Sequence, residues 1–196
     1  VLSAEDHRFF AHHGVDAIRI AGATVTNLTS NRRYLVGAST LTQQLVKNTL
    51  LHPGQTLSRK LREQALAMLL ERRLSKARIL ELYLNTAQWG NRLFGAQAAA
   101  RHYFDVDAQT LSPAQAAQLA VLLPRPSYYD VRGTTVYVEQ RTLWIQKQLP
   151  LVSLAPQLLL PKEEPGSGDE GGVAEVRSHD PDGGALPSSE GVAERV

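Results

Sequence analysis

The sequence contains no cysteine, only one methionine and no long apolar run. Without cysteine, a disulfide framework, a thiolate metal site and a cysteine nucleophile are all excluded. The longest apolar stretches, such as residues 119–123, are far shorter than the ~20 residues that a membrane-spanning helix needs. Neither strand-like alternation of apolar and polar residues nor an internal repeat is found. These absences favour an all-α fold built from amphipathic helices.

Helix-start signals divide the first 150 residues into successive helices. Cap residues precede apolar positions spaced three and four apart, which is the pattern of helices with one buried face. From residue 161 onward Pro, Gly, Ser and acidic residues dominate. We expect a single domain over residues 1–150, followed by a disordered tail over residues 151–196. The predicted helices run from Ser3 to Gly14, Asp16 to about Asn27, Ser39 or Thr40 to about Leu51, Ser58 onward, Ser75 onward, Gly95 to Phe104, Ser112–Pro113 to before Pro124, and about Val136 to Leu149.

The net charge of +2 conceals two regions of opposite sign. Residues 1–160 carry a net charge of +8, whereas residues 161–196 carry −6. The basic excess is greatest between residues 32 and 101, where 12 Lys and Arg face only three Glu. Such a field attracts polyanions or phosphate headgroups, so both nucleic acid and an anionic membrane surface are considered. Aromatic residues are sparse among these bases, which argues against nucleic acid.

Residues 37–48 (GASTLTQQLVKN) concentrate uncharged hydrogen-bonding groups around one ammonium group. So many polar side chains are unfavourable in a buried helix, and exposure to solvent alone does not explain why uncharged amides gather around a single Lys. An anionic, oxygen-rich ligand such as a phosphorylated sugar fits this mixture of groups. The candidate ligand-binding residues of the stretch are Ser39, Thr40, Gln43, Gln44, Lys47 and Asn48.

Arg59, Lys60 and Glu63 lie at spacings of three and four and therefore project from one helix face. Spacing alone favours a surface ion pair, which has little effect on stability. The nearby Lys47 strengthens a second interpretation, in which two basic helix starts form a phosphate pocket with their free backbone N–H groups. Within such a pocket Glu63 would orient the cations or hold a divalent ion.

Glu5 is the better candidate for a general base. It lies close to Phe9 and Phe10, whose apolar surface favours a carboxylic acid able to exchange protons near neutral pH. The alternative is a carboxylate that merely stabilises a helix N-terminus. We expect Asp6 to cap or orient rather than to catalyse.

Three histidines and one asparagine have less specific patterns. His7, His12 and His13 lack a carboxylate at zinc-site spacing, so no metal site is predicted there. Asn85, near a helix end, is either a cap residue or a residue beside the sugar in the groove.

Four stretches in this order resemble the peptidoglycan glycosyltransferases of family 51. They are residues 5–14 (EDHRFFAHHG), residues 37–48, residues 59–63 (RKLRE) and residues 78–85 (RILELYLN). The resemblance covers about residues 1–150, and four motifs in register are far more specific than any one of them. The family includes monofunctional biosynthetic transglycosylases and the transglycosylase domains of class A penicillin-binding proteins.

The resemblance implies a lysozyme-like bilobal helical fold with a small membrane-facing lobe around residues 27–60. It also implies inverting polymerisation of lipid II into β-1,4 glycan strands, with Glu5 deprotonating the acceptor 4-hydroxyl. Glu63 would organise the pyrophosphate site. The substrate-binding residues implied are Lys47, Arg59 and Lys60 at the pyrophosphate, Ser39, Thr40, Gln43, Gln44 and Asn48 along the donor site, and Asn85.

The same resemblance sets expectations for cofactors, partners and location. No cofactor is required, although Mg²⁺ or Mn²⁺ at the pyrophosphate site stays an open option. The expected partners are lipid II, the growing glycan strand, the inner-membrane surface and other cell-wall synthesis proteins, but not nucleic acid. The expected location is the outer face of the bacterial cytoplasmic membrane, through an N-terminal anchor that this chain lacks.

Two points keep alternatives open. Arg92 stands where the family usually has glycine, which could alter a turn at the edge of the groove. A lysozyme-like hydrolase or lytic transglycosylase of finished glycan would share the fold, but it would not need Lys47, Arg59 and Lys60. A non-enzymatic binding module ranks below both.

Overall fold

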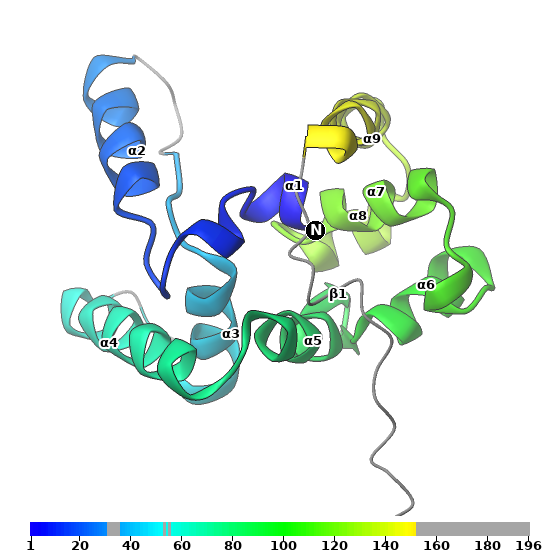
Figure 1. The fold of residues 1–196 in the computed structure, drawn as a ribbon. Coiled ribbons are helices and arrows are strands. Elements are labelled where there is room, and N and C mark those ends of the chain that lie inside the picture. The colour runs from blue at the N-terminus through cyan, green and yellow to red at the C-terminus, as the bar shows by residue number, and fades with distance from the viewer. Residues whose placement is uncertain (31–35, 53, 55, 152–196) are drawn as a thin grey trace, which may run out of the picture. The chain divides into compact units, whose positions relative to one another are not determined.

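A computed structural model describes residues 1–30, 36–52, 54 and 56–151. The described part is mainly helical (Figure 1), so the all-α prediction is confirmed. The predicted disordered tail falls, except for residue 151, outside the described residues. The α-helices are α1 (Leu2–Glu5), α2 (Ala17–Thr29), α3 (Leu41–Leu50), α4 (Leu57–Arg73), α5 (Lys76–Thr86), α6 (Ala96–Phe104), α7 (Pro113–Leu122), α8 (Pro126–Arg132) and α9 (Val136–Gln148).

Most predicted helix starts are confirmed, because a cap is a local interaction. The carboxylate of Asp16 accepts the backbone N–H groups of residues 18 and 19 at the start of α2. Ser75 caps α5 in the same way. Thr40 and Ser112 each form a capping box with the glutamine three residues later, and Pro113 occupies the first turn of α7.

Two predicted helices differ from the structure. Thr56, not Ser58, caps α4, since the Thr56 hydroxyl accepts the N–H of Arg59 at 3.2 Å. The helix predicted to begin with a Ser3 cap and to run to Gly14 instead begins at Leu2, with Ser3 inside it, and ends already at Glu5. A short 3₁₀ turn, Phe9–Ala11, follows. The predicted helix is interrupted at Asp6, whose backbone leaves the helical conformation and whose side chain bonds to distant groups.

The sequence did not predict helix α8 or a small β-hairpin. The hairpin pairs β1 (Gln88–Gly90) with β2 (Leu93–Phe94) in antiparallel register. Strands of three and two residues are too short to show alternation, so the pattern could not reveal them. Helix α8 begins at Pro126, directly after the predicted end of α7.

Arg92 forms the turn of this hairpin with a positive φ of 58°. A side chain makes the left-handed conformation costly, whereas glycine adopts it freely. We expect Arg92→Gly to raise the free energy of unfolding by roughly 0.5–1 kcal/mol, after allowance for the greater freedom of glycine in the unfolded chain. Urea denaturation measures this. Arg92→Ala removes the same charge but keeps a Cβ, and an equal gain there would contradict the backbone explanation.

Helix α3 packs against both α4 and α5, and α7 packs against α9 on the other side of the core (Figure 1). Large side chains from distant elements fill the core, among them Phe9, Leu41, Ile79, Tyr83 and Trp89, each at most 2% exposed. Because α3 contacts both neighbours, its polar residues can meet side chains from α4 and α5. None of the helices in the described ranges is both long and apolar enough to cross a bilayer.

Candidate active site

Two adjoining cavities border helix α3. The larger has a volume of about 480 Å³ and the smaller about 190 Å³. They share Lys47, Asn48 and Gln88, so together they form one groove. The larger cavity is lined by Lys47, Asn48, Leu51, His52, Gly54, Arg59, Thr86, Gln88 and Phe94. The smaller is lined by Gln44, Lys47, Asn48, Tyr83, Ala87, Gln88, Leu123, Pro124 and Pro126.

Arg59, Lys60 and Glu63 form a compact charged cluster at the start of α4. Glu63 is only 1% exposed, and each of its carboxylate oxygens faces one cation. Arg59 Nη1 lies 3.3 Å from Glu63 Oε2, and the Lys60 ammonium donates to Glu63 Oε1. Lys60 Nζ also donates to the Ser39 hydroxyl at 2.8 Å. The cluster holds two cations around one carboxylate and therefore keeps a positive charge beside the groove.

Glu5, the last residue of α1, is joined to the groove through α3. Its Oε2 accepts a hydrogen bond from Gln44 Nε2 at 2.9 Å. The Gln44 carbonyl accepts in turn from the Tyr83 hydroxyl of α5 at 3.1 Å. Burial, assisted by the negative charge of Glu5, raises the pKa of Tyr83 far above its usual value, so this hydroxyl remains a donor.

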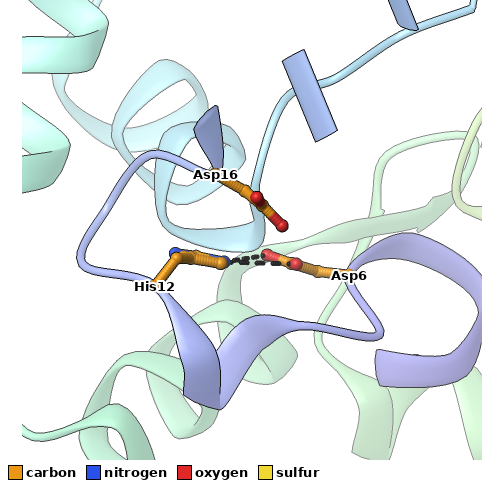
Figure 2. A group of neighbouring side chains, drawn as sticks. All are labelled: Asp6, His12 and Asp16. Atoms are coloured by element: carbon orange, nitrogen blue, oxygen red, sulfur yellow. Dashed lines mark hydrogen bonds and ion pairs between the residues drawn. The ribbon is translucent and has the colours of Figure 1, made fainter. Parts of the chain in front are cut away.

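Asp6, directly after α1, is bonded to α3 and to the buried His12, and Figure 2 shows its contact with His12. Its carboxylate accepts the backbone N–H of Leu41 at 3.0 Å and faces His12 Nε2 at 3.1 Å. Arg19 approaches the same carboxylate at 3.8 Å and donates to the backbone carbonyl of Glu5. This network fixes the end of α1 beside the start of α3, which supports an orienting role, and the expectation that Asp6 does not catalyse stays a prediction.

Asp6, His12 and Asp16 bring their ligand atoms within 4.8 Å of one another, close enough for a metal ion (Figure 2). Protein donors already engage both carboxylates. Asp16 accepts two backbone N–H groups of α2 and the Arg8 guanidinium at 3.0 Å. Burial alone would raise the pKa of Asp16, but the Arg19 N–H and the Arg8 guanidinium outweigh burial and hold that pKa below its usual value. The group therefore acts as an electrostatic link between elements.

The lowered pKa of Asp16 leads to a prediction of how the free energy of unfolding depends on pH. Its stabilising contribution is present above the usual carboxyl pKa of 3.8 and is lost as the pH falls through the lower folded-state value. Asparagine cannot ionise. As the pH is lowered below 4, we therefore expect the free energy of unfolding to fall less in Asp16→Asn than in the parent. Urea denaturation across this range measures the difference. The exposed Asp105→Asn should follow the parent, and identical curves for all three proteins would contradict the prediction.

The transglycosylase family model matches residues 1–150. The chain belongs to the transglycosylase family. It is 49% identical to a biosynthetic peptidoglycan transglycosylase of Alcanivorax borkumensis over 84% of this chain and 67% of that protein. Proteins of the same name from Nitrosospira multiformis and Bordetella avium are 42% and 44% identical over 79% of this chain, and over 66% and 65% of their own lengths. The chain spans about two thirds of the length of these relatives.

The predicted site residues of this transglycosylase lie in two environments. Ser39, Gln44, Lys47, Asn48, Arg59 and Lys60 are exposed or partly exposed along or beside the groove. Thr40 and Gln43 are almost completely buried and hold the start of α3, with the Thr40 hydroxyl donating to the Gly14 carbonyl. Asn85 is exposed and bonds to the Glu81 carbonyl within its own helix. Their predicted contacts with substrate stay predictions.

Several groove residues were not identified from the sequence, among them Tyr83, Gln88 and Phe94. Tyr83 is buried like a core residue, but its hydroxyl bonds to Gln44 at the groove. Gln88 and Phe94 lie on the hairpin that was not predicted. The position of Tyr83 inside the fourth motif was the one available signal for its role.

Proposed function

We propose that this transglycosylase is a peptidoglycan glycosyltransferase that joins the disaccharide units of lipid II into β-1,4 glycan strands. One observation carries the proposal: α3 connects a carboxylate to a cationic pocket. Gln44 contacts Glu5, and one turn later Lys47 lines the same cavity as Arg59. The name of the relatives, biosynthetic peptidoglycan transglycosylase, supports the same activity.

In the proposed reaction Glu5 accepts the proton of the acceptor 4-hydroxyl. The resulting oxygen attacks the anomeric carbon of the donor from the face opposite the leaving group, so the configuration inverts. The bond to the undecaprenyl pyrophosphate breaks, and its electrons stay on the departing phosphate oxygen. Lys47, Arg59 and Lys60 stabilise that negative charge. Glu63 holds Arg59 and Lys60 in place for this purpose.

The charged cluster also bears on the metal option. Both oxygens of Glu63 already face cationic donors, which disfavour a divalent ion next to them. We propose that Arg59 and Lys60 supply the positive charge at this place, and no step is assigned to a metal ion.

We place the reaction at the outer face of the cytoplasmic membrane, because its substrate is lipid-linked. Apolar side chains exposed on α2 and α4 support contact with a membrane surface. They include Ile18, Val25, Leu28, Leu57 and Leu61, which are 59–81% exposed. The growing glycan strand and other cell-wall synthesis proteins are the further partners proposed.

Labelled lipid II offered to the purified product of the complete gene tests the function. We expect labelled glycan strands, and we expect moenomycin to block their formation. Incubation with purified sacculi, without lipid II, tests the hydrolase or lytic alternative. Release of muropeptides from sacculi together with failure to use lipid II would contradict the proposal.

A further inference from the structure

Tyr83, Gln44 and Glu5 come from three different helices and meet in one chain of hydrogen bonds. The phenol donates to the amide carbonyl at 3.1 Å, and the amide N–H donates to the carboxylate at 2.9 Å. We propose that Tyr83 is a positioning residue, whose hydroxyl holds the Gln44 amide with its N–H groups toward Glu5. The inference rests on the proposed role of Glu5 as general base.

The donor and acceptor capacities of the three groups impose this orientation. An ionised carboxylate can only accept hydrogen bonds, and a protonated phenol has one proton to donate. With the amide N–H toward Glu5, every polar contact in the chain is favourable. With the amide reversed, its carbonyl oxygen would face the carboxylate and the phenol would lose its acceptor. The phenol therefore selects the amide orientation that favours ionised Glu5.

The surroundings make Tyr83 well suited to this task. Its ring is only 2% exposed in the core beside α3, so the hydroxyl has little freedom to move. Gln44 is less deeply buried, and its amide depends more on such support. A further charged group near Glu5 is Arg19, which donates to its backbone carbonyl. Arg19 is unchanged in the variants below, so its effect cancels in the comparison.

Loss of the phenol hydroxyl should change the protonation of the base more than substrate binding. Without it, the amide can rotate and present its carbonyl to Glu5, which favours the protonated acid. For Tyr83→Phe we expect kcat for lipid II polymerisation to fall roughly tenfold with KM nearly unchanged. The acid limb of the pH profile of kcat/KM should move up by roughly one pH unit.

Tyr103→Phe is the matched control. It likewise removes a tyrosine hydroxyl, that of the partly buried Tyr103, which bonds to the Trp89 carbonyl and to Asp130 and not to the Glu5 network. Both variants lose an internal hydrogen bond and should lose thermal stability. Only Tyr83→Phe should move the acid limb. If the limb stays in place while stability falls, Tyr83 is merely structural and the inference is overturned.

A double-mutant cycle with Gln44→Met tests whether Tyr83 acts through the amide. Once the amide is absent, the added Tyr83→Phe change should shift the acid limb no further, and an equal further shift would overturn the inference. If Tyr83→Phe does not fold, Gln44→Met alone must move the limb upward, and an unmoved limb overturns the inference.

Glu5→Gln separates the positioning role of Tyr83 from the role of Glu5 as general base. An active Glu5→Gln variant refutes the base itself, whereas an inactive one with an unmoved limb in Tyr83→Phe refutes only the positioning role.

Discussion

Replacement of Glu5 by glutamine should lower the rate of glycan synthesis by roughly 10³-fold, because a positioned general base contributes roughly 10²–10⁴-fold. The variant should still fold, since the Gln44 N–H that donates to Glu5 can donate equally to an amide oxygen. Lipid II binding should therefore survive the loss of turnover. Polymerisation of labelled lipid II and its equilibrium binding to the same preparation measure the two effects.

Glu139→Gln provides the control for the Glu5 experiment. Glu139 lies exposed in the first turn of α9, away from the groove residues named above, and the substitution makes the same chemical change. It should polymerise lipid II at the parent rate. A Glu5→Gln variant with more than a tenth of parent activity would show that Glu5 is not the general base.

Replacement of Glu63 by glutamine should lower the free energy of unfolding by about 3 kcal/mol, because removal of one partner from a buried ion pair leaves an uncompensated charge. Arg59 and Lys60 are 20% and 36% exposed and keep part of their hydration, so we expect the lower end of the range for buried pairs. Turnover should fall as well, since neither cation is then held at the groove. Chemical denaturation and lipid II polymerisation measure these effects.

Glu81→Gln makes the matched comparison for Glu63. Glu81 pairs with Arg78 at the same spacing of three residues and at 2.9 Å, but this pair is about half exposed. Exposed pairs have little effect on stability, so its loss should cost at most about 0.5 kcal/mol. Equal losses in the two variants would show that burial does not decide the strength of the Glu63 cluster.

The helix starts show how far local signals reach. Asp16, Ser75 and Ser112 were identified correctly because each cap bonds within two or three residues of itself. Ser58 was misassigned because Thr56, two residues earlier, offers an equivalent hydroxyl. The first helix was predicted too long, since the bond that occupies Asp6 comes from Leu41, 35 residues away. Spacing along the chain carries no information about such a partner.

The sequence by itself determined the helical class, most caps and the residue types of the site, because these depend on neighbours within one or two helical turns. It also brought Arg59, Lys60 and Glu63 onto one helix face. Only the tertiary structure decided that Thr40 and Gln43 turn inward, and that the Tyr83 hydroxyl reaches Glu5 through Gln44. The packing of α3 against α5 creates that last contact between residues 39 positions apart, which no local pattern encodes.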